Sequence, residues 1–173
     1  MNERDYLAEY AAYLKKDLGK NNIAQNLFQR FKELITDGRL PAGYMLEGET
    51  ASYAAKRATA EDIAQLEYYY EKMKEHRNDV NQFVDYDAMF HMQVANATHN
   101  KLLISTMMAS KDSFENGIRL AMRESLIQNP RVIDVTIELH GKIIECIKNG
   151  DFQNAYTAMR EHISYVNLTV KYG

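Results

Sequence analysis

Residues 133–166 have the sequence IDVTIELHGKIIECIKNGDFQNAYTAMREHISYV. Apolar residues recur three or four positions apart in both halves of this stretch, as they do on one face of an α-helix. The tripeptide Asn149-Gly150-Asp151 separates the two halves, and glycine is the residue that most often ends a helix. The apolar faces are Ile133, Ile137, Ile144 and Ile147 before the turn, and Phe152, Ala155, Met159 and Val166 after it. This pattern predicts an antiparallel hairpin of two helices.

Helical spacing extends over almost the whole chain and predicts an all-α fold. Thr59 and Asp62 resemble a capping box at the start of one helix. Asn100 resembles the N-cap of another, and Pro130 is expected to begin the first helix of the hairpin. Apolar stripes precede the hairpin at residues 7–18, 23–34, about 46–57, 63–73, 80–98 and 103–118. We therefore expect an antiparallel helical bundle of about six to seven helices, with an N-terminal helical segment at 1–45 and a domain at 46–173.

The composition excludes several classes of protein. The 173 residues are 46% hydrophobic and 26% charged, an ordinary globular balance. Because the net charge is −3, the chain lacks the basic excess of a protein that binds DNA by itself. The single cysteine, Cys146, rules out an internal disulfide and is typical of a reducing compartment. No apolar run approaches the roughly 18 residues of a membrane span, and the polar N-terminus is no signal peptide. We expect a cytoplasmic protein without a membrane segment.

Polar residues interrupt three of the apolar stripes at positions where core residues are expected. Asp87 and His91 are four residues apart and so project from one face of one helix. His140 and His162 lie at equal distances from the turn at Asp151, so in an antiparallel hairpin they lie at one level, about 16 Å from it. If the helix with Asp87 packs against the hairpin, the four side chains meet inside the bundle. Such a cluster is how bundles build metal sites.

Two interpretations of these residues compete. One histidine on an apolar face is more often a satisfied core residue than a ligand, but an unpaired buried imidazole or carboxylate is costly. Three of the five histidines and one aspartate facing inward together favour a metal site. Their donor atoms suit a divalent metal such as Zn²⁺, Ni²⁺ or Mn²⁺. The other two histidines, His76 and His99, fall in a charged turn and at a helix end, and we interpret both as surface residues.

The same residues resemble a known family, the gluconate-repressor (GntR) transcription regulators of the fatty-acid-regulator (FadR) type. The resemblance is to their C-terminal ligand-sensing domain, the FCD domain, and it covers residues from about 46 to the C-terminus. The motifs that carry it are Asp87-Ala88-Met89-Phe90-His91, the tract Gln93 to Asn100, Leu139-His140-Gly141-Lys142-Ile143-Ile144, Asn149-Gly150-Asp151, Met159-Arg160-Glu161-His162-Ile163, Leu46-Glu47-Gly48-Glu49-Thr50-Ala51 and the segment Ala54 to Thr59.

The resemblance implies a site, a ligand and a partner. The residues that match the family's metal ligands are Asp87, His91, His140 and His162, which would bind a divalent metal. A small carboxylate, often a sugar acid or hydroxy acid, would bind at or beside that metal. The resemblance also implies a homodimer and a role in transcription.

The N-terminal region departs from the family pattern. Residues 35–46, ITDGRLPAGYML, resemble the opening of the winged helix-turn-helix that precedes the sensor in this family. The recognition segment that should follow is absent before the sensor motif begins. We therefore expect the DNA-binding head to be truncated or missing. DNA binding by this chain alone is doubtful, because no recognition helix that could enter the major groove is evident.

Two other functions remain open. Histidine and carboxylate ligands with a vacant metal position can activate water, as in a metalloenzyme, but the catalytic motifs HExxH and GxSxG are absent. A helical oligomerisation module with polar packing residues is the third possibility. Of the three we favour the sensor and expect no enzymatic activity. Arg119 and Arg123 are candidates to bind the carboxylate of an effector, since guanidinium matches carboxylate in shape, and Asn100 is a further candidate.

Overall fold

A computed structural model describes residues 42–108 and 131–171, with residues 119, 122, 123, 126 and 129 between them. The chain divides into two units, Met1–Leu40 and Pro41–Gly173, and the described residues belong to the second unit. The expected segment at 1–45 therefore lies almost entirely outside the described residues, and the boundary at 45/46 stays a prediction.

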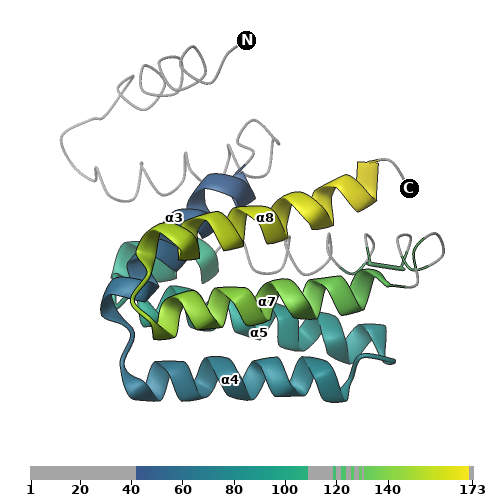
Figure 1. Cartoon of the computed structure of the whole chain (residues 1–173), viewed down its shortest axis with the longest axis horizontal. Helices are drawn as coiled ribbons and strands as arrows, with labels where there is room; N and C mark the ends of the chain where they lie inside the picture. The colour runs from purple at the N-terminus through teal and green to yellow at the C-terminus, as the bar shows by residue number, and fades with distance from the viewer. Residues whose placement is uncertain are drawn as a thin grey trace, which may run out of the picture. The chain divides into compact units, whose positions relative to one another are not determined.

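The described part of the chain is helical and contains no strand, which confirms the all-α prediction. Its helices are α3 (Ala42–Arg57), α4 (Ala60–Glu75), α5 (Val80–Ala97), α7 (Val132–Lys148) and α8 (Phe152–Lys171). Helix α3 packs against α5, α7 and α8, while α4 packs against α5 and α7. Helices α7 and α8 form the predicted hairpin, with α4 on the other side of α7 (Figure 1).

Local hydrogen bonds explain where these helices begin and end. The hydroxyl of Thr59 accepts a hydrogen bond from the Asp62 amide, and the Asp62 carboxylate accepts one from the Thr59 amide, which confirms the capping box. Gly150 has φ +67° at the turn between α7 and α8, a conformation that glycine adopts without strain. The amide of Asp151 donates to the carbonyl oxygen of Cys146 at 2.9 Å, which completes the helix-ending motif of α7.

Two helices begin at positions other than those expected. Helix α3 begins at Ala42, four residues before the expected Leu46. Helix α7 begins at Val132 rather than at Pro130, after the side chain of Asn129 accepts a hydrogen bond from the Arg131 amide at 3.1 Å.

The core lies between α3, α4, α5, α7 and α8, and most of the predicted apolar faces are buried there. Its largest fully buried apolar side chains are Phe83, Phe90, Leu66, Met73, Met122, Ile143 and Met159. Phe152 was expected on the buried face of α8, but it is 42% exposed and lies under the ammonium group of Lys56 at 4.1 Å. Ala155, in the same first turn of α8, is fully buried, so spacing alone misplaced only the first residue of this face.

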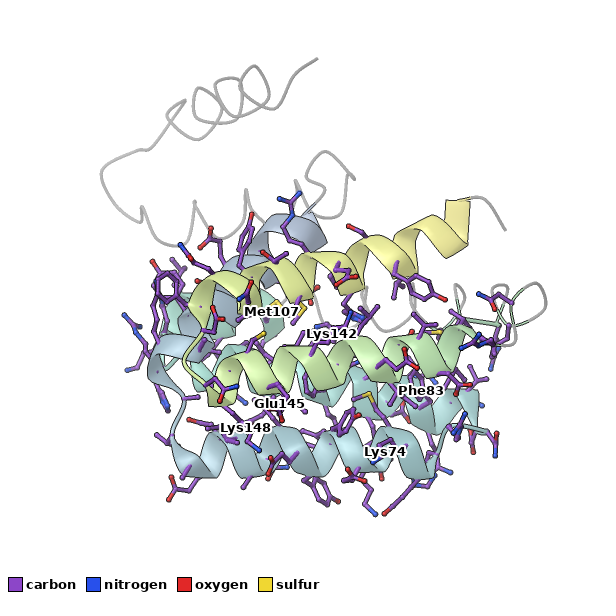
Figure 2. All side chains as sticks on the ribbon, in the orientation of Figure 1. Lys74, Phe83, Met107, Lys142, Glu145 and Lys148 are labelled. Atoms are coloured by element: carbon purple, nitrogen blue, oxygen red, sulfur yellow. The ribbon has the colours of Figure 1, made fainter. Side chains whose placement is uncertain are left out.

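The outer surface of the bundle is charged. Lys142, Glu145 and Lys148 are exposed along α7 (Figure 2), and Lys148 forms an ion pair with Glu67 of α4 at 2.7 Å. Among the described residues, no helix is both long enough and apolar enough to cross a membrane.

Candidate metal centre

The structure brings together the four residues that the sequence singled out. Asp87 and His91 come from α5, His140 from α7 and His162 from α8, and each is at most 1% exposed. One potential ligand atom from each side chain can be chosen so that all four lie within 4.8 Å of one another. The rings of His140 and His162 have centroids 4.3 Å apart, as expected for residues at one level of the hairpin.

The environment of His140 indicates a cation at its second nitrogen. Its Nδ1 lies 2.8 Å from the backbone carbonyl oxygen of Thr136. Since a carbonyl oxygen only accepts, Nδ1 carries the hydrogen, and Nε2 of the neutral ring has a free lone pair. This Nε2 lies 3.0 Å from Oδ1 of Asp87, and neither atom has a hydrogen-bond partner in the described structure. Two buried acceptors this close repel each other unless a proton or a metal ion lies between them.

The other two imidazoles face each other. The Nε2 atoms of His91 and His162 are 3.1 Å apart, and the two rings are stacked with centroids 5.1 Å apart. On its far side, Nδ1 of His91 contacts Oε2 of Glu47, a residue of α3 that is 3% exposed. His162 Nδ1 is buried and has no hydrogen-bond partner in the described part of the chain.

An apolar wall holds the rings in place. Phe90 packs edge-on against His140, with ring centroids 4.6 Å apart and planes at 88°. Phe90 is fully buried, one position before His91 on α5. A buried, closely packed surround of this kind strengthens electrostatic interactions within the cluster.

Charges within the cluster shift its pKa values in opposite directions. Burial would lower the pKa of His91, but the carboxylates of Glu47 and Asp87 outweigh burial and raise it to about 8. Burial would raise the pKa of Asp87, but contact with His140 and the charge of His91 lower it. For His162, burial and the neighbouring imidazoles act together and hold the pKa well below its ordinary value. At neutral pH His91 is therefore the protonated ring and His162 the neutral one, and a metal ion in the cluster would take the place of the proton on His91.

The donor set fits a divalent transition metal. Three imidazole nitrogens and one carboxylate oxygen are the ligands that Zn²⁺, Ni²⁺ and Mn²⁺ accept in proteins. Nε2 of His140, Nε2 of His91, one nitrogen of His162 and Oδ1 of Asp87 are the atoms that would hold such an ion. The ion would neutralise the facing lone pairs that the described residues leave unsatisfied.

Sequence reasoning missed the part that Glu47 plays at this site. Glu47 entered the sequence analysis only as part of a family motif. However, it shares the inward face of α3 with Thr50, Ala51 and Ala54, all at most 1% exposed. A carboxylate on an apolar helical face is the signal that identified Asp87, and it applies equally to Glu47.

The predicted effector residues lie elsewhere on the described surface. Arg119 pairs with Asp85 at 2.6 Å and also donates to the side chain of Asn81, and Arg123 donates to the same Asn81 oxygen at 2.9 Å. The side chain of Asn100 accepts a hydrogen bond from the Leu102 amide at 3.0 Å, as expected for an N-cap. Among the described residues, the hydrogen bonds and ion pairs of these three side chains involve none of the four cluster residues, and their role in binding an effector stays a prediction.

Comparison with known proteins finds a matching domain family and bacterial relatives that are named as operon regulators. Residues 42–165 match the FCD domain family. A protein named as the regulator of the L-lactate dehydrogenase operon in Escherichia coli K12 is 31% identical over 153 residues, which are 85% of this chain and 58% of the relative. The Glc operon transcriptional activator of the same strain is 27% identical over 127 residues, 70% and 50% of the two chains.

A third relative has the same kind of name. The Uxu operon regulator of Haemophilus influenzae is 27% identical over 129 residues, which are 75% of this chain and 48% of the relative. The chain thus spans about half the length of the curated relatives it matches. The family match confirms the resemblance that the sequence motifs indicated.

Proposed function

Because the chain belongs to the FCD domain family, we propose that it is the ligand-sensing part of a GntR-type transcription regulator, and that it binds a divalent metal and a small organic acid. Its three relatives are named as operon regulators, and this supports a binding role rather than a catalytic one. In this proposal the segment at 1–45 is separate from the sensor at 46–173, and the sensor acts as a homodimer.

The observation that carries the metal proposal is the facing pair of unsatisfied acceptors. Nε2 of His140 and Oδ1 of Asp87 are 3.0 Å apart, fully buried and without hydrogen-bond partners among the described residues. A packing role would relieve this repulsion only if His140 carried a second hydrogen and formed an ion pair with Asp87, and a merely structural polar cluster normally satisfies its members. A metal ion held between α5, α7 and α8 relieves it.

The acid is proposed from the coordination chemistry and from the relatives. Four protein ligands leave positions vacant on an octahedral ion, and a carboxylate with a neighbouring hydroxyl can occupy two of them. One relative is named for an L-lactate dehydrogenase operon, and lactate is such a hydroxy acid. A small 2-hydroxy acid is therefore the first effector to test.

Metal content tests the first half of the proposal. Protein stripped with a chelator is dialysed against Zn²⁺, Ni²⁺ or Mn²⁺ and analysed for bound metal. We expect about one ion per chain, as a single closed cluster requires, and none in the double variant His140→Ala with His162→Ala. The matched control is His99→Ala, because the His99 side chain is 51% exposed and pairs with Asp62. Full metal occupancy in the double variant would refute the site.

Thermal melting tests the second half. L-lactate at 100 times its dissociation constant should stabilise the metal-loaded protein by roughly 2.7 kcal/mol. It should have no effect after EDTA treatment, and the lactate should be recovered unchanged. Stabilisation that is equal with and without metal would show that the acid binds away from the cluster. Conversion of the lactate would show an enzyme instead.

A further inference from the structure

We propose that Glu47 is a positioning residue of the metal centre, which holds His91 from behind so that its Nε2 faces the metal. This inference rests on the proposed metal site. The four expected ligands come from α5, α7 and α8, whereas Glu47 belongs to α3. Its assignment therefore adds a fourth helix to the centre.

The contact between Glu47 and His91 is fully enclosed. Oε2 of Glu47 touches Nδ1 of His91, and the two side chains are 4% and 1% exposed. Glu49, two residues along the same helix, is exposed to solvent. A buried carboxylate is costly unless it is paired, and His91 is the partner that the described structure gives Glu47. The carboxylate is therefore matched to this imidazole.

The contact selects one form of the imidazole ring. An ionised carboxylate only accepts hydrogen bonds, so Nδ1 of His91 must carry the hydrogen. Nε2 of the neutral ring is then the nitrogen with a free lone pair, and it lies 3.1 Å from Nε2 of His162 inside the cluster. Metal-binding histidines commonly donate their other ring nitrogen to a carboxylate or carbonyl group in this way. The Nδ1 atom of His140 contacts a carbonyl oxygen, that of Thr136, and the Nδ1 atom of His91 contacts a carboxylate oxygen, that of Glu47.

The same contact places Glu47 behind the ring rather than among the ligands. Nδ1 and Nε2 lie on different edges of the imidazole, so the ring stands between the Glu47 oxygen and the facing nitrogen of His162. The charge of Glu47 still acts on the site at this distance, because both side chains are buried. A divalent ion with Asp87 alone would leave one net positive charge buried, and Glu47 brings the sum to zero. Removing Glu47 should therefore weaken metal binding without removing a ligand.

The test compares two changes at Glu47 with one at Glu49. Glu47→Ala removes both the charge and the acceptor, Glu47→Gln removes the charge but keeps an acceptor oxygen, and Glu49→Gln is the exposed control on the same helix. Zn²⁺ affinity is measured by competition with a chromogenic chelator. Ligand geometry is measured from the visible absorption of the Co²⁺-loaded protein. Circular dichroism of each metal-free variant confirms folding. If Glu47→Ala fails to fold, Glu47→Gln alone provides the test, because glutamine has nearly the same shape as glutamate.

We expect Glu47→Ala to bind Zn²⁺ about 10- to 100-fold more weakly than the unchanged protein, which is the usual effect of losing such a partner. Glu47→Gln should fall between the two, and Glu49→Gln should match the unchanged protein. All variants should keep one ion per chain and the same Co²⁺ spectrum. In nitrogen NMR spectra recorded above pH 8, where the ring is neutral, the hydrogen of His91 should reside on Nδ1 in the unchanged protein and should redistribute in Glu47→Ala.

Several results would overturn the inference. Affinity within twofold in both Glu47 variants would show that the carboxylate contributes nothing to the site. A changed Co²⁺ spectrum would show that Glu47 is itself a ligand rather than a positioning residue. If the unchanged protein binds no metal, the proposed function fails and this inference fails with it. If it binds metal normally and only the Glu47 effect is absent, the inference alone is wrong.

Discussion

Replacing His162 with leucine should separate the stability of the helical bundle from its response to metal. His162 is 1% exposed, its pKa is held well below the ordinary value by burial and by the neighbouring imidazoles, and its Nδ1 has no hydrogen-bond partner in the described structure. An unsatisfied buried polar atom costs about 1–3 kcal/mol. Without metal, His162 is therefore a destabilising residue that the fold tolerates.

The magnitude follows from what the substitution removes. His162→Leu loses the contact between its Nε2 and that of His91 at 3.1 Å, a hydrogen bond that contributes about 1 kcal/mol. It also removes the penalty of about 1–3 kcal/mol at Nδ1. Because Nε2 of His91 loses its partner at the same time, the gain and the cost are of similar size, and in EDTA we expect the variant to lie within about 2 kcal/mol of the unchanged protein. With metal at 100 times its dissociation constant, the unchanged protein gains roughly 2.7 kcal/mol, and the variant should gain nothing.

Thermal unfolding followed by circular dichroism, with EDTA or with Zn²⁺, measures both effects. A gain of 2.7 kcal/mol corresponds to a rise of roughly 5–10 °C in melting temperature for a chain of this size. The matched control is Met159→Leu, one turn earlier on α8 and 1% exposed, which conserves volume and should keep the metal response. The reasoning is refuted if His162→Leu in EDTA is destabilised by more than about 2 kcal/mol, or if Zn²⁺ still raises its melting temperature.

Three further predictions concern the rest of the molecule. Burial would raise the pKa of Asp62, but hydrogen bonds from Thr59 and His99 outweigh burial and lower the pKa below 3.8. Its stabilisation is therefore complete above that value and is lost as the pH falls through the folded pKa. Asp62→Asn should cost about 1 kcal/mol at pH 7 and progressively less below about pH 4 in urea unfolding, whereas a penalty that does not change with pH would contradict this. Gly141→Ala should be nearly neutral, because the gain of about 1 kcal/mol in helix propensity is offset by a Tyr70 hydroxyl 3.1 Å from the added carbon. In a Tyr70→Phe background the same change should stabilise, and a double-mutant cycle without coupling would oppose this account. With a net charge of −3, the chain should bind DNA weakly and without sequence preference in anisotropy titrations. Nanomolar binding to one DNA fragment would instead show a sequence-specific DNA-binding element within residues 1–45.

Much of the fold could be predicted because its signals are local. A helix begins and ends according to nearby residues, so the capping box at Thr59 and the turn at Gly150 were predicted correctly. The level of His140 and His162 was also predictable, since a short turn forces residues at equal distances from it to lie side by side. Their rings are 4.3 Å apart.

The contacts between distant segments could not be predicted in the same way. Spacing identifies the apolar face of a helix. It does not say which other helix packs against that face, or which residues of the face that helix buries. Phe152 was therefore assigned to the core although it is 42% exposed, while Ala155 on the same face is fully buried. The partners of Arg119 were hidden for the same reason, since Asp85 lies on another helix 34 residues earlier in the chain.

The candidate metal centre combines both kinds of information. The sequence by itself determined that Asp87, His91, His140 and His162 lie on inward faces, because each position follows from the period of one helix. Only the tertiary structure decided that α5 meets the hairpin at the level of the histidines and that α3 brings Glu47 behind His91. The reason is physical: helical periodicity depends on neighbouring residues, whereas the rotation and offset of one helix against another depend on how all the side chains of the core pack together.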